Sequence, residues 1–489
     1  MTSSSGSKLK ALASYTAWTL GGQVATTLLQ FGYAAVASRI VPDSGFGAFA
    51  VALSLSALIS LIAQGGLGQA VARTPELHSG KLSFLVLFAV GLGVVAGLLL
   101  VVLAAPWAAL WDAPDAVAPT RVIGVTAFLA PLSGLLLGVL RRLGEFRALA
   151  LLATTTSAAG MGVGVIAVVL APGPMALLVS PVVATLLLTI VALVLTRRHW
   201  WAKPEAAAAR ADLGFAWRVI GLSMLSYLIA NVGKWSVSRW VGTDSLGQWN
   251  RADVLTAVPI EQGTGALNRA VYPEFRHDIG VQSRTKQAWT DYLILTAWVS
   301  FPSSAILAGA APIATAILFG PGWEQAAAMA PLVAIRWGIT AVDTALAGAL
   351  EAVGRFRLIA VTTLVSLAIV MAGVVVTALT GSWVAALLGL IAGPLVRHLL
   401  NVALTSRRGA LDWFSLAKGY LWALAPSTVL GGAAALVSAG ALGSLPPIAG
   451  VFGAAILVAA VGTGITKWRN LPPTRILERY RSNASQTAG

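Results

Sequence analysis

The chain has 489 residues, of which 57% are hydrophobic and only 10% are charged, and its formal net charge is +15. Because a soluble domain carries about a quarter charged residues, this composition excludes an ordinary soluble protein and indicates a chain embedded in lipid. The absence of cysteine excludes disulfides and thiolate metal sites, and the four histidines are widely scattered, so we expect no metal and no cofactor.

Long apolar stretches follow one another along the whole chain. About twenty apolar residues are needed to cross the hydrocarbon core of a bilayer. Stretches of that length lie near residues 12–38, 45–70, 82–111, 115–140, 148–171, 175–196, 214–238, 246–270, 290–318, 325–350, 357–380, 383–405, 415–440 and 446–466. The sequence therefore predicts an all-α membrane protein with about fourteen transmembrane helices.

Most lysines and arginines lie in every second gap between these stretches, beginning with the N-terminus and ending with the tail. The opposite gaps hold only Arg39 and Arg239. Because cytoplasmic loops carry the excess of Lys and Arg, this alternation predicts both termini in the cytoplasm and an even number of helices. The same clusters do not form a nucleic-acid footprint, so we expect no nucleic-acid partner.

Polar residues recur at helical spacing within the first and seventh predicted spans. Gln30 belongs to such a stripe on the first span. The stripe on the seventh span includes Tyr227, Asn231, Lys234 and Ser238. Residues three or four positions apart share one face of a helix, so we expect these faces to line a wet interior. Lys234 is the strongest candidate for contact with a substrate. The alternative is a structural ion pair between Lys234 and Asp253 or another acid.

Further charged residues lie inside the eighth and tenth predicted spans. Arg251 begins the eighth span, and Arg336 and Asp343 lie two turns apart on the tenth, where they form either a structural pair or part of a coupling network. A charge within a span costs about 3 kcal/mol on insertion scales and normally faces a wet interior. The basic residues suit an anionic substrate. Three acidic residues are candidates for coupling to protons or sodium ions: Asp253, Glu261 and Asp343.

The chain resembles itself at an offset of 200 residues. Gly47, Arg39 and Val41 match Gly247, Arg239 and Val241, and a second echo relates LRRLGEFR, from Leu140, to LEAVGRFR, from Leu350. The repeat predicts two like-oriented six-helix lobes around a central cavity, with two extra helices after them. The predicted parts are an N-lobe at 1–196, a cytoplasmic linker at 197–213, a C-lobe at 214–405, two helices at 406–466 and a cytoplasmic tail at 467–489. Arg39 and Arg239, at the outer helix ends, either line the cavity or reach to headgroups.

Two strings carry a resemblance to a known family. The first is ASRIVPDSGFGAFAVALSLSALISLIAQGGLGQAVAR, from Ala37 to Arg73, and the second is VSRWVGTDSLGQWNRADVLTAVPIEQGTGALNRAVYPEF, from Val237 to Phe275. With the GRFR loop and the helix count, they resemble bacterial polysaccharide flippases of the multidrug/oligosaccharidyl-lipid/polysaccharide exporter superfamily. Lys234 departs from the family pattern, in which an acidic residue is frequent, and this puts cation coupling at that position in doubt.

The resemblance implies a transporter that moves an undecaprenyl-pyrophosphate-linked glycan across the bacterial cytoplasmic membrane by alternating access. It also implies membrane lipids, a polysaccharide polymerase and glycosyltransferases as partners. The alternatives are a multidrug/cation antiporter of the same fold, a lipid II flippase, and a non-transporting membrane scaffold. We expect no enzyme and no catalytic residues, because the sequence has no Walker A string, no HExxH and no Ser/His/Asp set.

Overall fold

The computed structural model describes residues 3–64, 67–68, 71, 78–206, 210–277, 282–466, 471–476 and 478. It divides into two compact units, Met1–Asn250 and Arg251–Gly489. The predicted tail at 467–489, the end of the predicted second span and Arg73 lie largely outside the described residues. The predicted division into lobes and linker stays a prediction.

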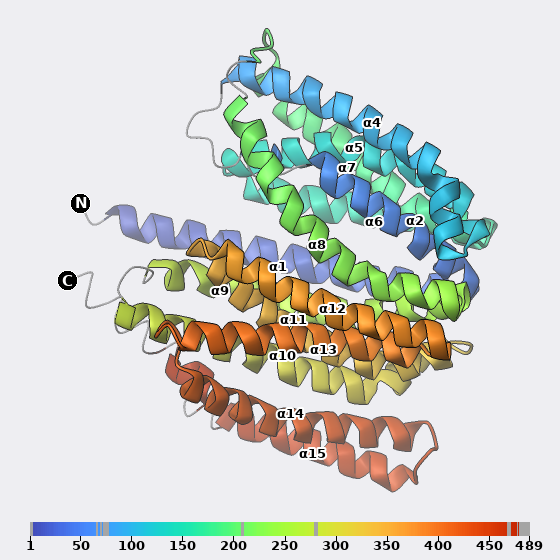
Figure 1. Cartoon of the computed structure of the whole chain (residues 1–489), viewed down its shortest axis with the longest axis vertical. Helices are drawn as coiled ribbons and strands as arrows, with labels where there is room; N and C mark the ends of the chain where they lie inside the picture. The colour runs from blue at the N-terminus through green and yellow to red at the C-terminus, as the bar shows by residue number, and fades with distance from the viewer. Residues whose placement is uncertain are drawn as a thin grey trace. The chain divides into compact units, whose positions relative to one another are not determined.

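The first unit is a bundle of long helices (Figure 1). Its helices are α1 (Ser3–Ser38), α2 (Asp43–Gln64), α4 (Ser79–Trp111), a short 3-10 turn η1 (Pro114–Ala116), α5 (Val117–Arg142), α6 (Phe146–Leu170), α7 (Pro174–Trp200) and α8 (Arg210–Trp240). The first turns of α9 (Thr243–His277), as far as Asn250, also belong to it. Antiparallel neighbours pair in the order α4 on α5 and α6 on α7, and α2 packs against α5 and α8. Leu82, Leu85, Leu135 and Leu136 form the centre of the α4–α5 core.

The second unit contains the rest of α9 and six further helices. These are α10 (Gln282–Phe319), α11 (Glu324–Ala352), α12 (Phe356–Thr380), α13 (Trp383–Ser406), α14 (Trp413–Ala441) and α15 (Pro447–Thr466). The strongest packing joins α10 to α11 and α14, and α12 to α13. The last two helices therefore belong to this unit through α10, and α15 packs on α14 (Figure 1).

The predicted all-α membrane fold is confirmed. Among the described residues, fourteen long α-helices match the fourteen predicted spans, and no strand is present. Eleven of these helices are long and apolar enough to cross a membrane. The other three, α1, α8 and α9, are long enough but more polar, and α9 carries Arg251, Asp253 and Glu261 in succession. The helices extend past the predicted ends because a helix can continue into the headgroup region, beyond the apolar core.

The shorter sequence echo corresponds to two matching turns, one in each unit. Gly144 and Gly354 have φ angles of 75° and 74°. In both turns the amide of the next residue donates to the carbonyl five residues earlier, at 3.0 Å. This is the hydrogen bond of a Schellman turn, in which glycine adopts the left-handed conformation without steric cost. The repeated GxFR string is therefore a repeated way of ending one helix and starting the next.

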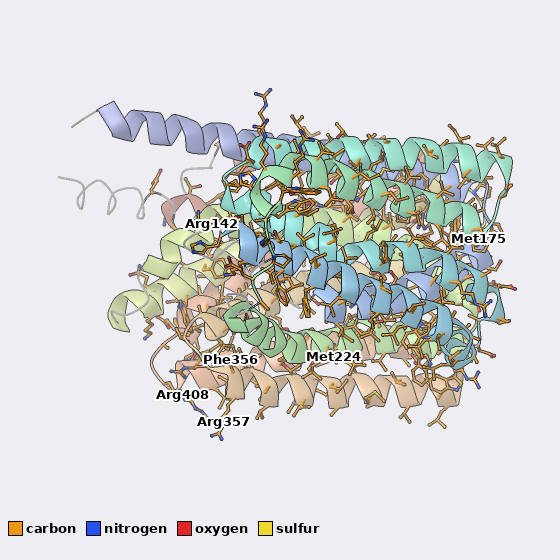
Figure 2. The ribbon with its side chains drawn as sticks, turned by 90° about the horizontal axis from the view of Figure 1, so that it is seen from above. Arg142, Met175, Met224, Phe356, Arg357 and Arg408 are labelled. Atoms are coloured by element: carbon orange, nitrogen blue, oxygen red, sulfur yellow. The ribbon has the colours of Figure 1, made fainter. Side chains whose placement is uncertain are left out.

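Labelled residues place several of the loops at the ends of each unit (Figure 2). In the first unit Arg142 lies at the end opposite to Met175, as Figure 2 shows. In the second unit Arg357 and Arg408 lie at one common end (Figure 2). Two basic loops of the second unit thus share one end, as the alternating charges predicted for them, and the orientation of the termini stays a prediction.

The longer repeat brings two glycines into reciprocal contact within the first unit. A Cβ on Gly47 would lie 2.1 Å from the carbonyl oxygen of Thr243, and a Cβ on Gly247 would lie 1.9 Å from that of Asp43. Asp43 and Thr243 are also 200 residues apart, so the two contacts are equivalent in the repeat. The side-chain amide nitrogen Nε2 of Gln248 donates to the Asp43 carboxylate at 3.1 Å across the same junction. The first turns of α2 and α9 thus pack backbone to backbone.

Substituting Gly247 with alanine is expected to lower the free energy of unfolding by about 1–3 kcal/mol, because the added methyl group forces the two backbones apart. The measurement is thermal unfolding of the purified protein in detergent. Gly21→Ala is the matched control, because no described atom lies within 4 Å of a Cβ at Gly21 on α1. Alanine there is expected to be neutral or slightly stabilising. Equal melting temperatures for the two variants would contradict the close contact.

Asp412 caps the start of α14, outside the membrane-spanning segment. Its carboxylate accepts hydrogen bonds from the amide of Ser415 at 3.3 Å and from the Ser415 hydroxyl at 2.9 Å. These bonds favour the charged form and lower the pKa of Asp412 below its ordinary value. The cap therefore stabilises the folded protein above the ordinary aspartate pKa, and this contribution is lost as the pH falls through the lower pKa of the folded state.

Asp412→Ala is therefore expected to cost about 1 kcal/mol of unfolding free energy at pH 7. The difference from the wild type is expected to shrink below about pH 4, where the carboxyl group protonates. Thermal unfolding of both proteins at the two pH values measures this. A difference that is the same at both values would show that the charge of the cap contributes nothing.

Candidate functional site

The second unit holds a buried arginine on α11 that faces an aspartate on α9. The exposed fractions of Arg336 and Asp253 are 6% and 8%. The Nη1 atom of Arg336 lies 3.8 Å from Oδ1 of Asp253. The indole N–H of Trp337 donates to the same oxygen at 3.2 Å, and the Arg336 guanidinium lies 5.0 Å from the centroid of the Trp337 ring. This carboxylate oxygen thus accepts a hydrogen bond from Trp337 and faces the charge of Arg336.

The Arg336 guanidinium can still donate a hydrogen bond to a ligand. Among the described residues, no atom accepts a hydrogen bond from its buried Nη1, since 3.8 Å is too long for one. A buried donor without a partner costs about 1–3 kcal/mol. Arg251 is also buried, with its guanidinium 5.8 Å from the centroid of Phe319. The facing turns of α9 and α11 therefore bring Arg336 beside Asp253, with Glu261 as a second acidic neighbour, and leave Nη1 of Arg336 without an acceptor among the described residues. An anionic ligand could supply that acceptor.

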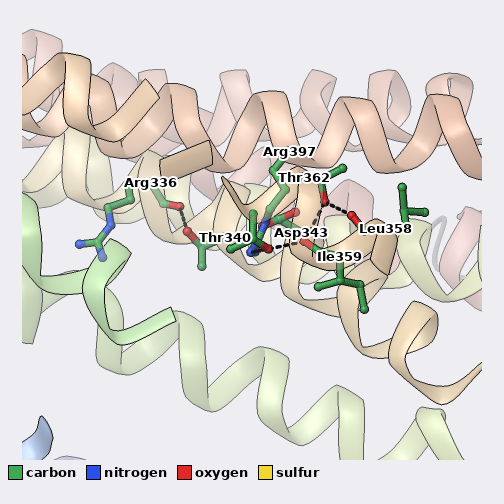
Figure 3. Close-up of polar contacts among 8 residues, drawn as sticks. Arg336, Thr340, Asp343, Leu358, Ile359, Thr362 and Arg397 are labelled. Carbon is green, nitrogen blue, oxygen red and sulfur yellow. Dashed lines mark hydrogen bonds and ion pairs between the residues drawn. The ribbon is translucent and has the colours of Figure 1, made fainter. Parts of the chain in front are cut away.

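A second ion pair lies further along α11. Asp343 is fully buried, and Arg397 of α13 contacts its Oδ2 with two nitrogens, Nε at 2.7 Å and Nη2. The Nη1 of Arg397 donates to the hydroxyl of Thr363 on α12 at 3.3 Å. Figure 3 shows the Arg336 guanidinium pointing away from the Asp343–Arg397 pair. Arg336 and Asp343 therefore do not pair, and each has a partner on another helix.

The partner role of Arg397 was not predicted from the sequence, although this arginine lies within a predicted span. It begins a polar stripe on α13 that continues with Asn401 and Thr405, four and eight residues later. Asn401 and Thr405 are fully buried, and no described group forms a hydrogen bond with the amide atoms of Asn401. The spacing of four residues is the signal that would have found this stripe.

In the first unit, the predicted polar face of the seventh span lies on α8. The hydroxyl of Tyr227 donates to the carbonyl of Ser54 on α2 at 2.6 Å, and the hydroxyl of Ser238 donates to the carbonyl of Trp111 on α4 at 2.8 Å. The side-chain amide of Asn231 donates to the Tyr227 carbonyl at 3.0 Å. Lys234 is half-buried. Much of this face therefore holds α8 against its neighbours.

The remaining predicted residues are dispersed. Arg239 is exposed and pairs with Asp112 at 3.3 Å, Arg39 and Glu261 are exposed, and Gln30 is half-buried. Of the predicted residues, the structure brings together Arg336 and Asp253. Arg251 lies two positions before Asp253 in the sequence. The structure brings Asp343 to Arg397, a residue that the prediction did not include.

Comparison with known proteins shows which family the chain belongs to. The model of the polysaccharide biosynthesis protein family matches residues 36–328, more than half of the chain. The chain belongs to this family. The chain is 24% identical over 344 residues to the succinoglycan biosynthesis transport protein ExoT of Rhizobium meliloti (strain 1021). This alignment covers 69% of this chain and 68% of that protein.

The fold of this family member is also that of solved transporters. The lipid II flippase MurJ, in an inward closed conformation, superposes with a TM-score of 0.69 at 11% identity, over 91% of this chain and 98% of MurJ. The eukaryotic MATE transporter AtDTX14 gives 0.53 at 15% identity, over 85% and 99%. The recognition of a polysaccharide flippase of the multidrug/oligosaccharidyl-lipid/polysaccharide exporter superfamily is confirmed, and the protein is a multi-pass membrane transporter.

Proposed function

We propose that the protein flips a polyprenyl-pyrophosphate-linked oligosaccharide, with undecaprenol as the lipid, across the bacterial cytoplasmic membrane. The observation that carries this proposal is Arg336, a buried guanidinium with an unsatisfied Nη1 in the described structure. A pyrophosphate is the anionic group of such a substrate and accepts charge-assisted hydrogen bonds from arginine. One relative is named a succinoglycan biosynthesis transport protein, and this supports a glycan cargo.

The other predicted residues enter the proposal with distinct roles. Arg251 and Arg336 bind the pyrophosphate in the second unit, and Lys234, Asn231, Gln30, Arg39 and Arg239 are further substrate contacts. Asp253, Glu261 and Asp343 are the proposed residues for coupling to protons or sodium ions. Both termini face the cytoplasm, the two six-helix lobes alternate access, and the chain performs no catalysis of its own. A polymerase and glycosyltransferases are the expected partners in polysaccharide assembly.

A cationic drug needs a different site. It would need buried acidic groups free of arginine partners, whereas Asp253 and Asp343 both face arginines. The buried charges therefore favour an anionic substrate over the antiporter alternative.

The experiment is reconstitution of the purified protein into vesicles that contain a fluorescent polyprenyl-pyrophosphate-linked glycan. A membrane-impermeant quencher is added outside the vesicles. Flipping is measured as the loss of fluorescence that follows when labelled lipid moves from the inner to the outer leaflet. The proposal expects faster loss than in protein-free vesicles. Lipid II and a cationic dye, assayed in the same vesicles, test the two other transport functions. Movement of the dye without movement of either lipid-linked sugar would exclude the proposal.

A further inference from the structure

A pocket of about 450 Å³ lies at one end of the first unit. One wall consists of Ser83, Val86 and Leu87 near the start of α4. The other wall consists of residues 200–204, which run from the end of α7 into the segment that follows it. The volume lies within the range of about 300–1,000 Å³ that is typical of small-molecule sites.

Hydrogen bonds hold the two walls together. The Ser83 hydroxyl accepts from the amide of Ala202 at 3.1 Å and contacts the carbonyl of Trp200. The amide of Glu205 donates to the carbonyl of Gly80 at 3.0 Å. These hydrogen bonds fix the segment after α7 against the start of α4, so both walls of the pocket are held in place.

The length of α4 places the pocket at the membrane surface. Its 33 residues span about 50 Å, whereas the hydrocarbon core is about 30 Å thick, so the ends of α4 reach the headgroup region. Below the pocket, the outer face of α4 is apolar, and Leu87, Leu98 and Val102 are at least 60% exposed. A chain of methylene groups along this face would be continuous with the pocket.

One cation and two indoles line the pocket, and two further cations lie in the helix turn that leads to it. Lys203 lines it, and Arg197 and Arg198 are exposed in the last turn of α7. Trp201 is 82% exposed, and its ring centroid lies 5.7 Å from that of Trp200. Indole rings favour the interface between headgroups and acyl chains, and basic residues at that depth attract anionic headgroups.

We infer that this pocket binds an anionic glycerophospholipid of the cytoplasmic leaflet, with its phosphate at Lys203 and one acyl chain along Val86 and Leu87. An apolar wall joined to a cationic rim at headgroup depth matches this molecule, which carries its negative charge directly above two hydrocarbon chains. The site belongs to the first unit alone, and none of its lining residues is among the predicted substrate contacts. It therefore does not depend on which substrate the protein moves.

Native mass spectrometry of the full chain in detergent micelles tests this inference. The protein is titrated with phosphatidylglycerol, phosphatidylcholine and undecaprenyl phosphate, and the bound fraction gives an apparent Kd for each. Wild-type protein is expected to bind phosphatidylglycerol several-fold more tightly than the other two. Lys203→Gln is expected to weaken that binding about five-fold. Ala202→Trp, which adds bulk to an exposed residue of the wall, is expected to weaken binding of both phospholipids.

Arg408→Gln is the matched control, because it removes an exposed cation from the other unit and is expected to leave every Kd unchanged. Thermal unfolding of each variant separates loss of the site from loss of the fold. Equal affinity for the two phospholipids would overturn the inference, as would unchanged binding in both pocket variants. Tighter binding of undecaprenyl phosphate that Ala202→Trp removes would assign the pocket to a prenyl chain instead.

Discussion

Replacing Arg336 with glutamine is expected to slow the flipping of a pyrophosphate-linked glycan by about 10- to 150-fold. A hydrogen bond to a charged group contributes about 1.5–3 kcal/mol, and each 1.4 kcal/mol is a factor of ten. Arg336 is buried, and its Nη1 has no acceptor among the described residues, so the substrate would supply the missing partner. The measurement is the initial flipping rate in vesicles that contain equal amounts of folded protein.

Two further variants show whether charge or packing explains the loss. Arg336→Lys keeps the charge but loses the planar fork, so an intermediate rate is expected. Asp253→Asn keeps the hydrogen-bond acceptor for Trp337 and removes the competing carboxylate, so binding of the glycan lipid in the absence of an ion gradient is expected to be kept. If Arg336→Gln flips the glycan as fast as the wild type, Arg336 is a structural residue only.

The largest expected loss of stability follows from Arg397→Met. Arg397 donates to Asp343 with Nε at 2.7 Å, and Asp343 is fully buried, so the substitution leaves an uncompensated carboxylate between helices. Breaking a buried pair in this way costs about 3–5 kcal/mol. Thermal unfolding in detergent, together with the yield of monodisperse protein, measures the effect.

The double variant Asp343→Leu with Arg397→Met is expected to recover most of this loss, because no buried charge then remains unpaired. Arg407→Met, an exposed substitution one residue after the end of α13, is the control and is expected to change stability little. A double variant that is less stable than Arg397→Met would show that the pair contributes specific contacts beyond its charge.

The sequence predicted the helices well because the bilayer restricts what a span can be. Each span must satisfy its own backbone hydrogen bonds and stay apolar for about twenty residues, so length and composition locate it. The repeat also predicted equivalent positions in the two halves where the backbone geometry requires glycine. Gly144 and Gly354 occupy the same left-handed turn, and Gly47 and Gly247 occupy equivalent backbone contacts.

The candidate site was predicted only in part, because polar residues on one helical face can either line a water-filled interior or bond to neighbouring helices. On α8 the hydroxyls of Tyr227 and Ser238 bond to carbonyls of neighbouring helices, which the spacing alone could not distinguish from residues that line water. The sequence also did not show which charged residues form ion pairs with one another. Asp343 pairs with Arg397, 54 residues away, and not with Arg336 on its own helix. Such pairings depend on which helices pack together, and the period of one helix does not contain that information.

Recognition of the anionic headgroup is the central claim, and one comparison of flipping rates tests it directly. Purified wild-type protein is reconstituted with the same fluorescent glycan attached to a polyprenyl lipid either through pyrophosphate or through an uncharged linker. We expect the pyrophosphate-linked glycan to cross at least tenfold faster, with that advantage lost in Arg336→Gln. Equal rates for the two lipids in the wild type would contradict the account.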